Sequence, residues 1–252
     1  MRVTGQQRGV VCALALPLLF AMAIPAAAQD KNIRSISRYR VKPDRDGDFR
    51  AAIKDYVGVI KKANPDRGFT LWLGLTGPRE YVLASYYSKF AEMDVMEDPK
   101  LKDVQAQLTG IGARISACVD SGDRYVDELL PELSLPRGTE LPKMVRMMRT
   151  QVKPDKVNAY TDLIKSELLP AMQKSGVKLF LYARVRFGGP SQEFSSIIGL
   201  DSWSNLDEQS PVIKALGVDG YRQFVAKVTP LVERTEYNVY RFLPELSYIP
   251  AK

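Results

Sequence analysis

The chain has 252 residues, and its hydrophobic (45%) and charged (26%) fractions are ordinary for a folded protein of one large domain or two small ones. The absence of histidine excludes a Ser-His-Asp or Cys-His catalytic arrangement and histidine ligands for zinc or haem. The net charge of +7 comes from basic residues interleaved with acidic ones, so the sequence predicts no nucleic-acid partner.

Residues 1–28 have the pattern of a secretory signal peptide. Arg2 and Arg8 give a positive start, the stretch 10–24 is apolar, and Ala26-Ala27-Ala28 offers a cleavage site. A transmembrane anchor is the alternative, but the apolar stretch is short for a span and small residues follow it. We therefore predict a protein that is periplasmic or secreted after cleavage, with no membrane span in the mature chain.

Only Cys118 remains after this cleavage, so the mature chain cannot form an internal disulfide. Ile111, Ile115 and Val119 surround it at helical spacing, which favours a buried thiol over a nucleophile. The acidic residues show no calcium-loop spacing. We therefore predict no metal site and no cofactor, while a tyrosine-ligated haem is not formally excluded.

The first part of the mature chain predicts the order strand, helix, strand, strand, helix, strand. Alternating and helical periodicities place these elements at 33–41, 49–63, 69–75, 81–87, 90–119 (broken near Pro99) and 125–130. Asp44 is placed to cap the first helix, and Ser121-Gly122-Asp123 predicts a turn before the last strand.

The second part repeats the first. Val41-Lys42-Pro43-Asp44 returns at 152–155, and Leu130-Pro131-Glu132-Leu133-Ser134 returns at 243–247. The corresponding elements are strands at 144–152, 179–187, 194–200 and 237–242, a helix kinked by Pro170 and a helical region interrupted at Gly217. We predict units at 29–135 and 144–252, joined by a linker at 136–143.

The predicted fold class is α+β. Each βαββαβ unit has the ferredoxin-like order, with helices on one face of its sheet. The other face needs cover, and two units in one chain can cover each other. We expect two tandem ferredoxin-like units packed sheet to sheet as an internal pseudo-dimer, of the dimeric α/β-barrel type.

Several motifs resemble the dimeric α/β-barrel superfamily, especially NIPSNAP-like and antibiotic-biosynthesis-monooxygenase-like domains. They are the Val-Lys-Pro-Asp strand ends, Gly188-Gly189-Pro190, Asp201-Ser202-Trp203 before a helix, and the Leu-Pro-Glu-Leu-Ser endings. Some superfamily members are cofactor-free oxygenases or isomerases, and others bind haem. These motifs are structural, so the resemblance implies a fold and carries over no catalytic residue.

Strand alternation suggests where a ligand could bind. We assign the apolar faces of strands 69–75 and 179–187 to the helices, and the mixed faces to the space between the sheets. Arg38 and Arg149 occupy the same place in the two first strands and could bind an anion. The predicted ligand-binding residues are Trp72, Tyr182, Arg184, Arg186, Arg38 and Arg149.

The sequence leaves three functions open. The first is an exported protein that binds a small aromatic or anionic molecule between the sheets. The second is a cofactor-independent monooxygenase or isomerase using the same cavity. The third is a non-catalytic assembly protein, and further homo-oligomerisation fits any of the three. The structural alternative for the six residues is that the aromatic rings are core and the arginines pair with acids or reach solvent.

Overall fold

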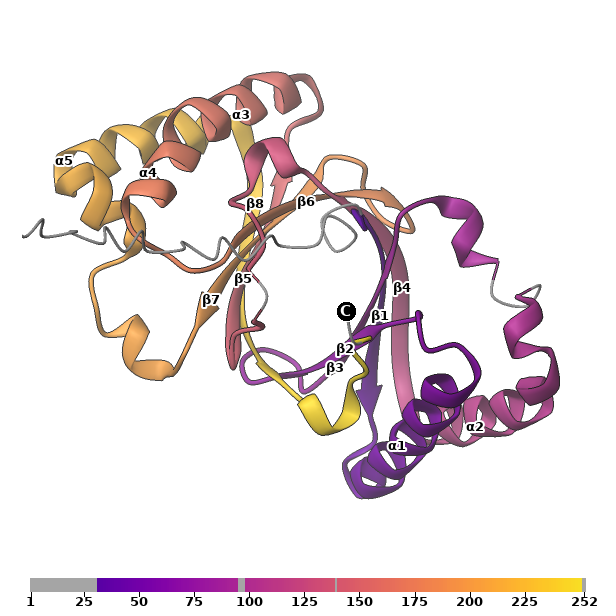
Figure 1. The fold of residues 1–252 in the computed structure, drawn as a ribbon. Coiled ribbons are helices and arrows are strands. Elements are labelled where there is room, and N and C mark those ends of the chain that lie inside the picture. The colour runs from indigo at the N-terminus through magenta and orange to yellow at the C-terminus, as the bar shows by residue number, and fades with distance from the viewer. Residues whose placement is uncertain (1–30, 95–97, 139, 251–252) are drawn as a thin grey trace, which may run out of the picture.

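The computed structural model describes residues 31–94, 98–138 and 140–250, so the predicted signal peptide at 1–28 lies outside the described residues. These residues form a mixed α+β fold around one closed antiparallel barrel with the strand order β1-β3-β2-β8-β5-β7-β6-β4 (Figure 1). No helix in the described ranges is long and apolar enough to cross a membrane.

The first half of the barrel contains β1 to β4. Its elements are β1 (Ile33–Val41), α1 (Asp46–Ala63), β2 (Phe69–Gly74), β3 (Tyr81–Tyr87), α2 (Gln105–Cys118) and β4 (Val119–Leu129). They lie side by side in the order β4-β1-β3-β2. The bounds predicted for β1 and β3 are confirmed, because apolar alternation marks both strands clearly.

The second half contains β5 to β8. Its elements are β5 (Met144–Val152), α3 (Val157–Leu163), α4 (Leu169–Lys174), β6 (Phe180–Phe187), β7 (Glu193–Leu200), α5 (Pro211–Val228) and β8 (Val232–Phe242). Their order, β8-β5-β7-β6, is that of the first half. A π-helical turn, Ile164–Leu168, separates α3 from α4, because Pro170 interrupts the α-helical hydrogen bonding as the sequence predicts.

The two halves join through strand edges. Strand β2 pairs with β8 at Trp72 and Phe242, and β4 pairs with β6 at Leu129 and Ala183. We expected two sheets facing each other, whereas the eight described strands form one continuous wall. Closure removes the exposed strand edges that two separate sheets would leave.

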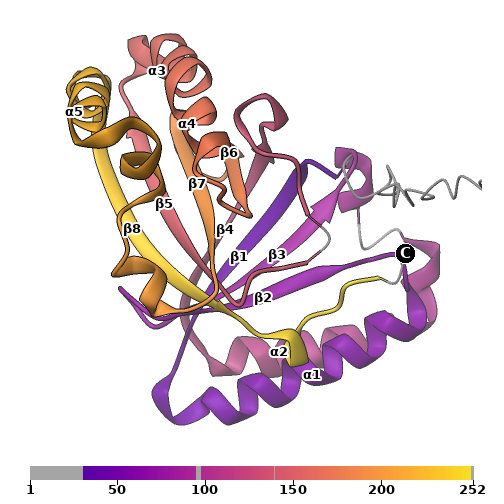
Figure 2. The ribbon, with the colours of Figure 1, turned by 60° about the vertical axis from the view of Figure 1, so that its left-hand side comes forward.

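The helices cover the outside of the barrel, α1 and α2 on the first half and α3, α4 and α5 on the second (Figure 2). In the first half, Phe49 and Ile53 of α1 pack on Leu71 and Tyr81 of the wall. In the second, helix residues Tyr160 and Ile164 pack on strand residues Tyr182, Phe180 and Phe194. The largest apolar clusters therefore lie between helices and barrel wall, and Cys118 is buried in the first of them, as predicted.

Two local predictions are wrong. Asp44 does not cap α1: Pro43–Arg45 forms a 3-10 turn, and Arg45 precedes the helix without a side-chain cap. No turn separates residues 121–123 from β4, because the strand pairs with β1 along this polar stretch. Gly122 fits there because a Cβ at this position would lie 2.5 Å from the Arg38 carbonyl oxygen.

Candidate functional site

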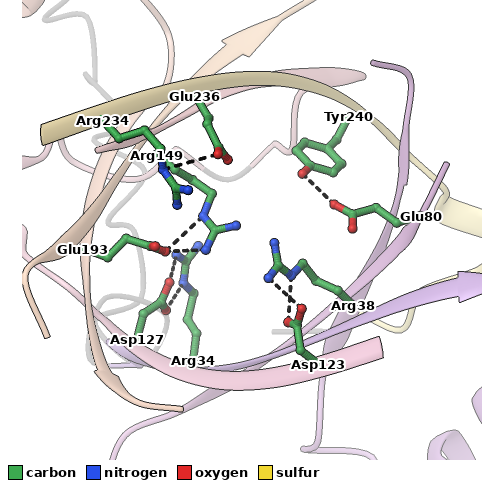
Figure 3. Close-up of polar contacts among 10 residues, drawn as sticks. All are labelled: Arg34, Arg38, Glu80, Asp123, Asp127, Arg149, Glu193, Arg234, Glu236 and Tyr240. Atoms are coloured by element: carbon green, nitrogen blue, oxygen red, sulfur yellow. Dashed lines mark hydrogen bonds and ion pairs between the residues drawn. The ribbon is translucent and has the colours of Figure 1, made fainter. Parts of the chain in front are cut away.

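Arginine–carboxylate pairs occupy the barrel interior between β1 and β4 (Figure 3). Arg34 and Asp127 are opposite each other in the strand register, as are Arg38 and Asp123. Arg34 donates from Nε and Nη2 to Asp127 at 2.8 and 2.6 Å, and the pair is buried. Arg38 donates in the same way to Asp123 at 2.7 and 2.6 Å, and Asp123 is half exposed at the barrel mouth.

Arg149 reaches the same region from β5, as the repeat predicts. Its Nε donates to Glu193 at 3.0 Å. The guanidinium carbons of Arg38 and Arg149 lie 5.6 and 5.8 Å from the centre of the Tyr125 ring. Burial and the Asp127 charge raise the pKa of Tyr125, so its hydroxyl stays protonated between these cations.

Glu80 is the exception in this network. It is buried, and its Oε1 accepts a hydrogen bond of 2.9 Å from the Tyr240 hydroxyl. No described cation lies within ion-pair distance of it. Glu193 holds the corresponding position at the start of β7 and pairs with Arg149. In the first half, Arg38 corresponds to Arg149 but pairs with Asp123 and not with Glu80.

Tyr182, Arg184 and Arg186 were expected inside the barrel, and this orientation is wrong. The Leu71 amide donates to Ser247 Oγ in the first half, and the Tyr182 amide makes the same bond to Ser134 Oγ. Tyr182 therefore corresponds to Leu71, which faces the helices. We assigned the purely apolar face of strand 179–187 to the helices, but that face, with Leu181 and Val185, lies inside the barrel and turns Tyr182, Arg184 and Arg186 outward.

The three residues accordingly lie on the outer side of β6. Tyr182 is fully buried, and its hydroxyl hydrogen-bonds that of Tyr160. Arg184 lies over the Phe194 ring and donates to the Ser191 carbonyl at 2.7 Å. Arg186 pairs with Glu128 at 3.5 Å, with both side chains substantially exposed.

Trp72 does face the interior, as predicted. Its ring centre lies 5.0 Å from that of Phe242, and its indole N–H donates to Thr70 Oγ1 at 2.9 Å. It packs with Val145 and Ile197 in an apolar cluster inside the barrel. The barrel interior is thus filled by apolar packing around Trp72 and by arginines whose charges acidic side chains already compensate.

A cleft of about 330 Å³ lies elsewhere, between the barrel wall and the loops and helices of the second half. Its apolar lining includes Pro142, Leu179, Ile198, Leu200 and Leu206, and its charged lining comprises Glu140, Arg146, Lys178, Asp201, Glu208 and Lys214. Four of these charged residues form two ion pairs across the rim: Lys178 with Asp201 at 3.5 Å and Lys214 with Glu208 at 2.6 Å.

Arg146 is the notable cation of this cleft. It is half-buried on β5, and no carboxylate of the described residues lies within ion-pair distance. Its guanidinium carbon lies 5.9 Å from the centre of the Tyr237 ring, which is 60% exposed. Sequence reasoning missed Arg146 because it looked for residues that both halves share. The residue of β1 that corresponds to Arg146 is Ser35, which is not an arginine.

The donor types do not suit a metal or haem. Across the described ranges, no cluster of three or more Cys, Asp or Glu side chains could hold a metal ion. The described residues that line the cleft include no Cys, Met or Tyr to ligate haem iron, and the chain has no histidine.

The sequence matches no family profile and no curated protein, but the fold matches solved structures. A candidate monooxygenase from Fusobacterium nucleatum is 11% identical with a TM-score of 0.60, covering 84% of this chain and 93% of that one. One from Lactobacillus acidophilus is 8% identical with a TM-score of 0.59, covering 84% and 94%. A mutant chlorite dismutase from Candidatus Nitrospira defluvii is 11% identical with a TM-score of 0.54, covering 85% and 93%. These likenesses establish a dimeric α/β-barrel-like fold and leave the chemistry open.

Proposed function

We propose that this chain is an exported binding protein for a small organic anion, which it holds in the cleft of the second half. The observation that carries the proposal is Arg146, a half-buried cation in a cleft without a carboxylate partner among the described residues. A desolvated guanidinium without a counter-charge is costly, and an anionic ligand would supply that charge.

The other walls define the rest of the ligand. Ile198 and Leu200 of β7 offer an apolar surface beside Arg146, and Leu179 and Pro142 extend it. A cleft of about 330 Å³ suits a molecule with one or two rings or a short aliphatic chain. The ligand class is therefore an amphipathic anion, with its charge on Arg146 and its apolar part on β7.

The barrel interior, our first expectation, is the second candidate. Arg38 and Arg149 both leave Nη1 without a hydrogen bond to any described residue, and both side chains are partly exposed. Their charges, however, are already paired with Asp123 and Glu193. An anion there would compete with two paired carboxylates, whereas no carboxylate of the described residues lies within ion-pair distance of Arg146.

The anionic dye 1-anilinonaphthalene-8-sulfonate combines a sulfonate with apolar rings and tests the proposal by its fluorescence. We expect one dye per folded chain, and binding at least about tenfold weaker in Arg146→Gln, since charge-assisted hydrogen bonds are lost. Arg222→Gln, which removes an exposed arginine of α5, is the matched control and should bind normally. Equal binding by Arg146→Gln and the control would refute the assignment.

A cofactor-independent monooxygenase acting in the same cleft is the alternative function. It is supported by the fold shared with the two candidate monooxygenases. The described lining offers no metal or haem ligand, so such a reaction would need a substrate that itself supplies electrons to oxygen. Oxygen consumption on adding an electron-rich phenol or anthrone would favour this alternative over simple binding.

The architecture suggests a tandem duplication, and we infer two ferredoxin-like units that form an internal pseudo-dimer. The support is the shared strand order and the matching serine hydrogen bonds that follow each Leu-Pro-Glu-Leu motif. Export rests on the sequence pattern of residues 1–28. N-terminal sequencing of exported protein should find a start near Gln29, and a start at Met1 would contradict it.

A further inference from the structure

The first half carries a cluster of polar side chains where a helix-facing sheet surface is normally apolar. Ser35 and Ser85 are opposite each other on β1 and β3, and Ser37 lies two residues along β1 on the same face. Tyr87 lies two residues along β3 from Ser85 on the same face, and Tyr56 of α1 packs against Phe69, which is opposite Ser85 on β2. We call the three serines and the two tyrosines, with Arg67 and Arg124, the polar window.

The two arginines approach the window from opposite sides. Arg124, on β4, reaches across to β1 and donates from Nε to Ser35 Oγ at 2.9 Å. Arg67, just before β2, reaches across to β3 and donates from Nη2 to the Tyr87 hydroxyl at 3.2 Å. Both groups therefore end over β1 and β3, neighbouring strands whose backbones lie about 4.8 Å apart.

Neither arginine has a carboxylate partner among the described residues, although most arginines of this chain pair with one. Each uses one nitrogen of its guanidinium in these contacts and keeps the others available. Burial raises the pKa of the Tyr56 hydroxyl, and the charges of Arg67 and Arg124 both act against that rise.

The corresponding residues of the second half support the view that residues of the polar window surround one place. Ser35 and Ser85 correspond to Arg146 and Ile198, and Tyr87 corresponds to Leu200, because the strand registers are the same. Leu71 corresponds to Tyr182, so Arg67, four residues before Leu71, corresponds to Lys178. All four counterparts line the one cleft described above, so their partners in the first half surround one place.

We propose that the polar window is a second anion site, which binds a small tetrahedral oxyanion of the phosphate or sulfate type. Two guanidinium groups that pair with no carboxylate of the described residues supply the charge, and serine and tyrosine hydroxyls supply further donors. Arg124 is exposed and Ser37, Tyr56 and Arg67 are half-buried, so the site is open to solvent. It is independent of the cleft and of the function proposed there.

Calorimetric titration of the full chain with inorganic phosphate and with sulfate, at an ionic strength fixed by KCl, tests the site. We expect one ion per chain, and binding at least about tenfold weaker in Arg124→Gln and in Arg67→Gln. Arg114→Gln is the matched control, because Arg114 lies on α2 and pairs with Asp55 at the surface.

Arg124 is exposed, so Arg124→Gln should fold and can decide the test even if Arg67→Gln does not. Absence of phosphate and sulfate binding to the wild type, or unchanged binding by Arg124→Gln, would overturn the proposal. Phenyl phosphate, titrated in parallel, separates the sources: tighter binding than phosphate indicates an esterified group, and weaker binding indicates a free ion.

Discussion

The two halves of the barrel share one frame and differ in what they place on it. Inside the barrel, the first half buries an ion pair, Arg34 with Asp127. The second half has Val145 and Tyr240 at those positions, in an apolar cluster with Trp72. Similar backbones thus carry either a buried salt bridge or hydrophobic packing, which shows that the strand order does not depend on the ion pair.

The helix-facing side shows a second difference. Where the first half has the polar window, with Ser35, Ser85 and Tyr87, the second has Arg146, Ile198 and Leu200 around a cleft. The positions that pack against α1 and α3 remain apolar or aromatic in both halves, such as Leu71 and Tyr182. The two halves therefore resemble each other where burial constrains them and differ where solvent can enter.

The largest expected effect comes from breaking the buried pair of the first half. Arg34→Val leaves the Asp127 carboxylate buried and unpaired, and should lower the free energy of unfolding by about 4 kcal/mol. The double variant Arg34→Val/Asp127→Tyr copies the second half and should recover most of that loss. Chemical denaturation measures both, and a double variant no more stable than the single one would show that the halves are not interchangeable here.

A smaller effect separates the two glutamates at corresponding positions. Glu193→Gln deprives Arg149 of its carboxylate and should lower the free energy of unfolding by about 2 kcal/mol. Glu80→Gln should change it by less than about 0.5 kcal/mol, because its amide oxygen can still accept the Tyr240 hydrogen bond. Thermal or chemical denaturation measures both variants. If Glu80→Gln lowers the free energy of unfolding as much as Glu193→Gln does, Glu80 also stabilises a cation.

The smallest expected effect is the pH dependence that Asp46 of the first half contributes. Burial alone would raise the pKa of Asp46, but hydrogen bonds from Tyr81, Arg79 and Arg50 outweigh burial and leave it lowered. A lowered folded-state pKa stabilises the fold above the unfolded value of about 3.9 and loses that contribution as the pH falls further. Asp46 is partly exposed, so solvent screens these contacts and less than about 1 kcal/mol is at stake.

The second half begins α3 at Val157, where α1 begins at Asp46, and so lacks this contribution. Asp46→Asn should therefore remove this contribution to the acid sensitivity and leave that of Asp155 and Glu208 in the second half unchanged. Denaturation midpoints measured at pH 7 and pH 3 test this difference. A variant as acid-sensitive as the wild type would assign the effect to other carboxylates.

Much of the fold could be predicted from the sequence, because alternation and helical periodicity report burial directly. The bounds of β1, β3 and β5 follow from it, and the repeated motifs predict the shared order. Barrel closure could not be predicted, because it depends on edge pairing between β2 and β8 and between β4 and β6. Those contacts join segments with no local signal of their partners.

The candidate site was less predictable. Strand alternation assigns residues to two faces but does not say which face is inside, so our rule that the purely apolar face meets the helices misplaced Tyr182 and Arg184. Arg38 and Arg149 were found because both halves have an arginine at that position. Arg146 was missed because the corresponding residue of the first half, Ser35, is a serine, so comparing the halves gave no reason to select it.

A crystal structure of the complex with 1-anilinonaphthalene-8-sulfonate tests the central claim most directly, because it shows where an amphipathic anion binds. We predict the sulfonate within hydrogen-bonding distance of Arg146, with the rings against Ile198 and Leu200. Dye bound at the barrel mouth between Arg38 and Arg149, with the cleft empty, would contradict the claim and return the site to the barrel interior.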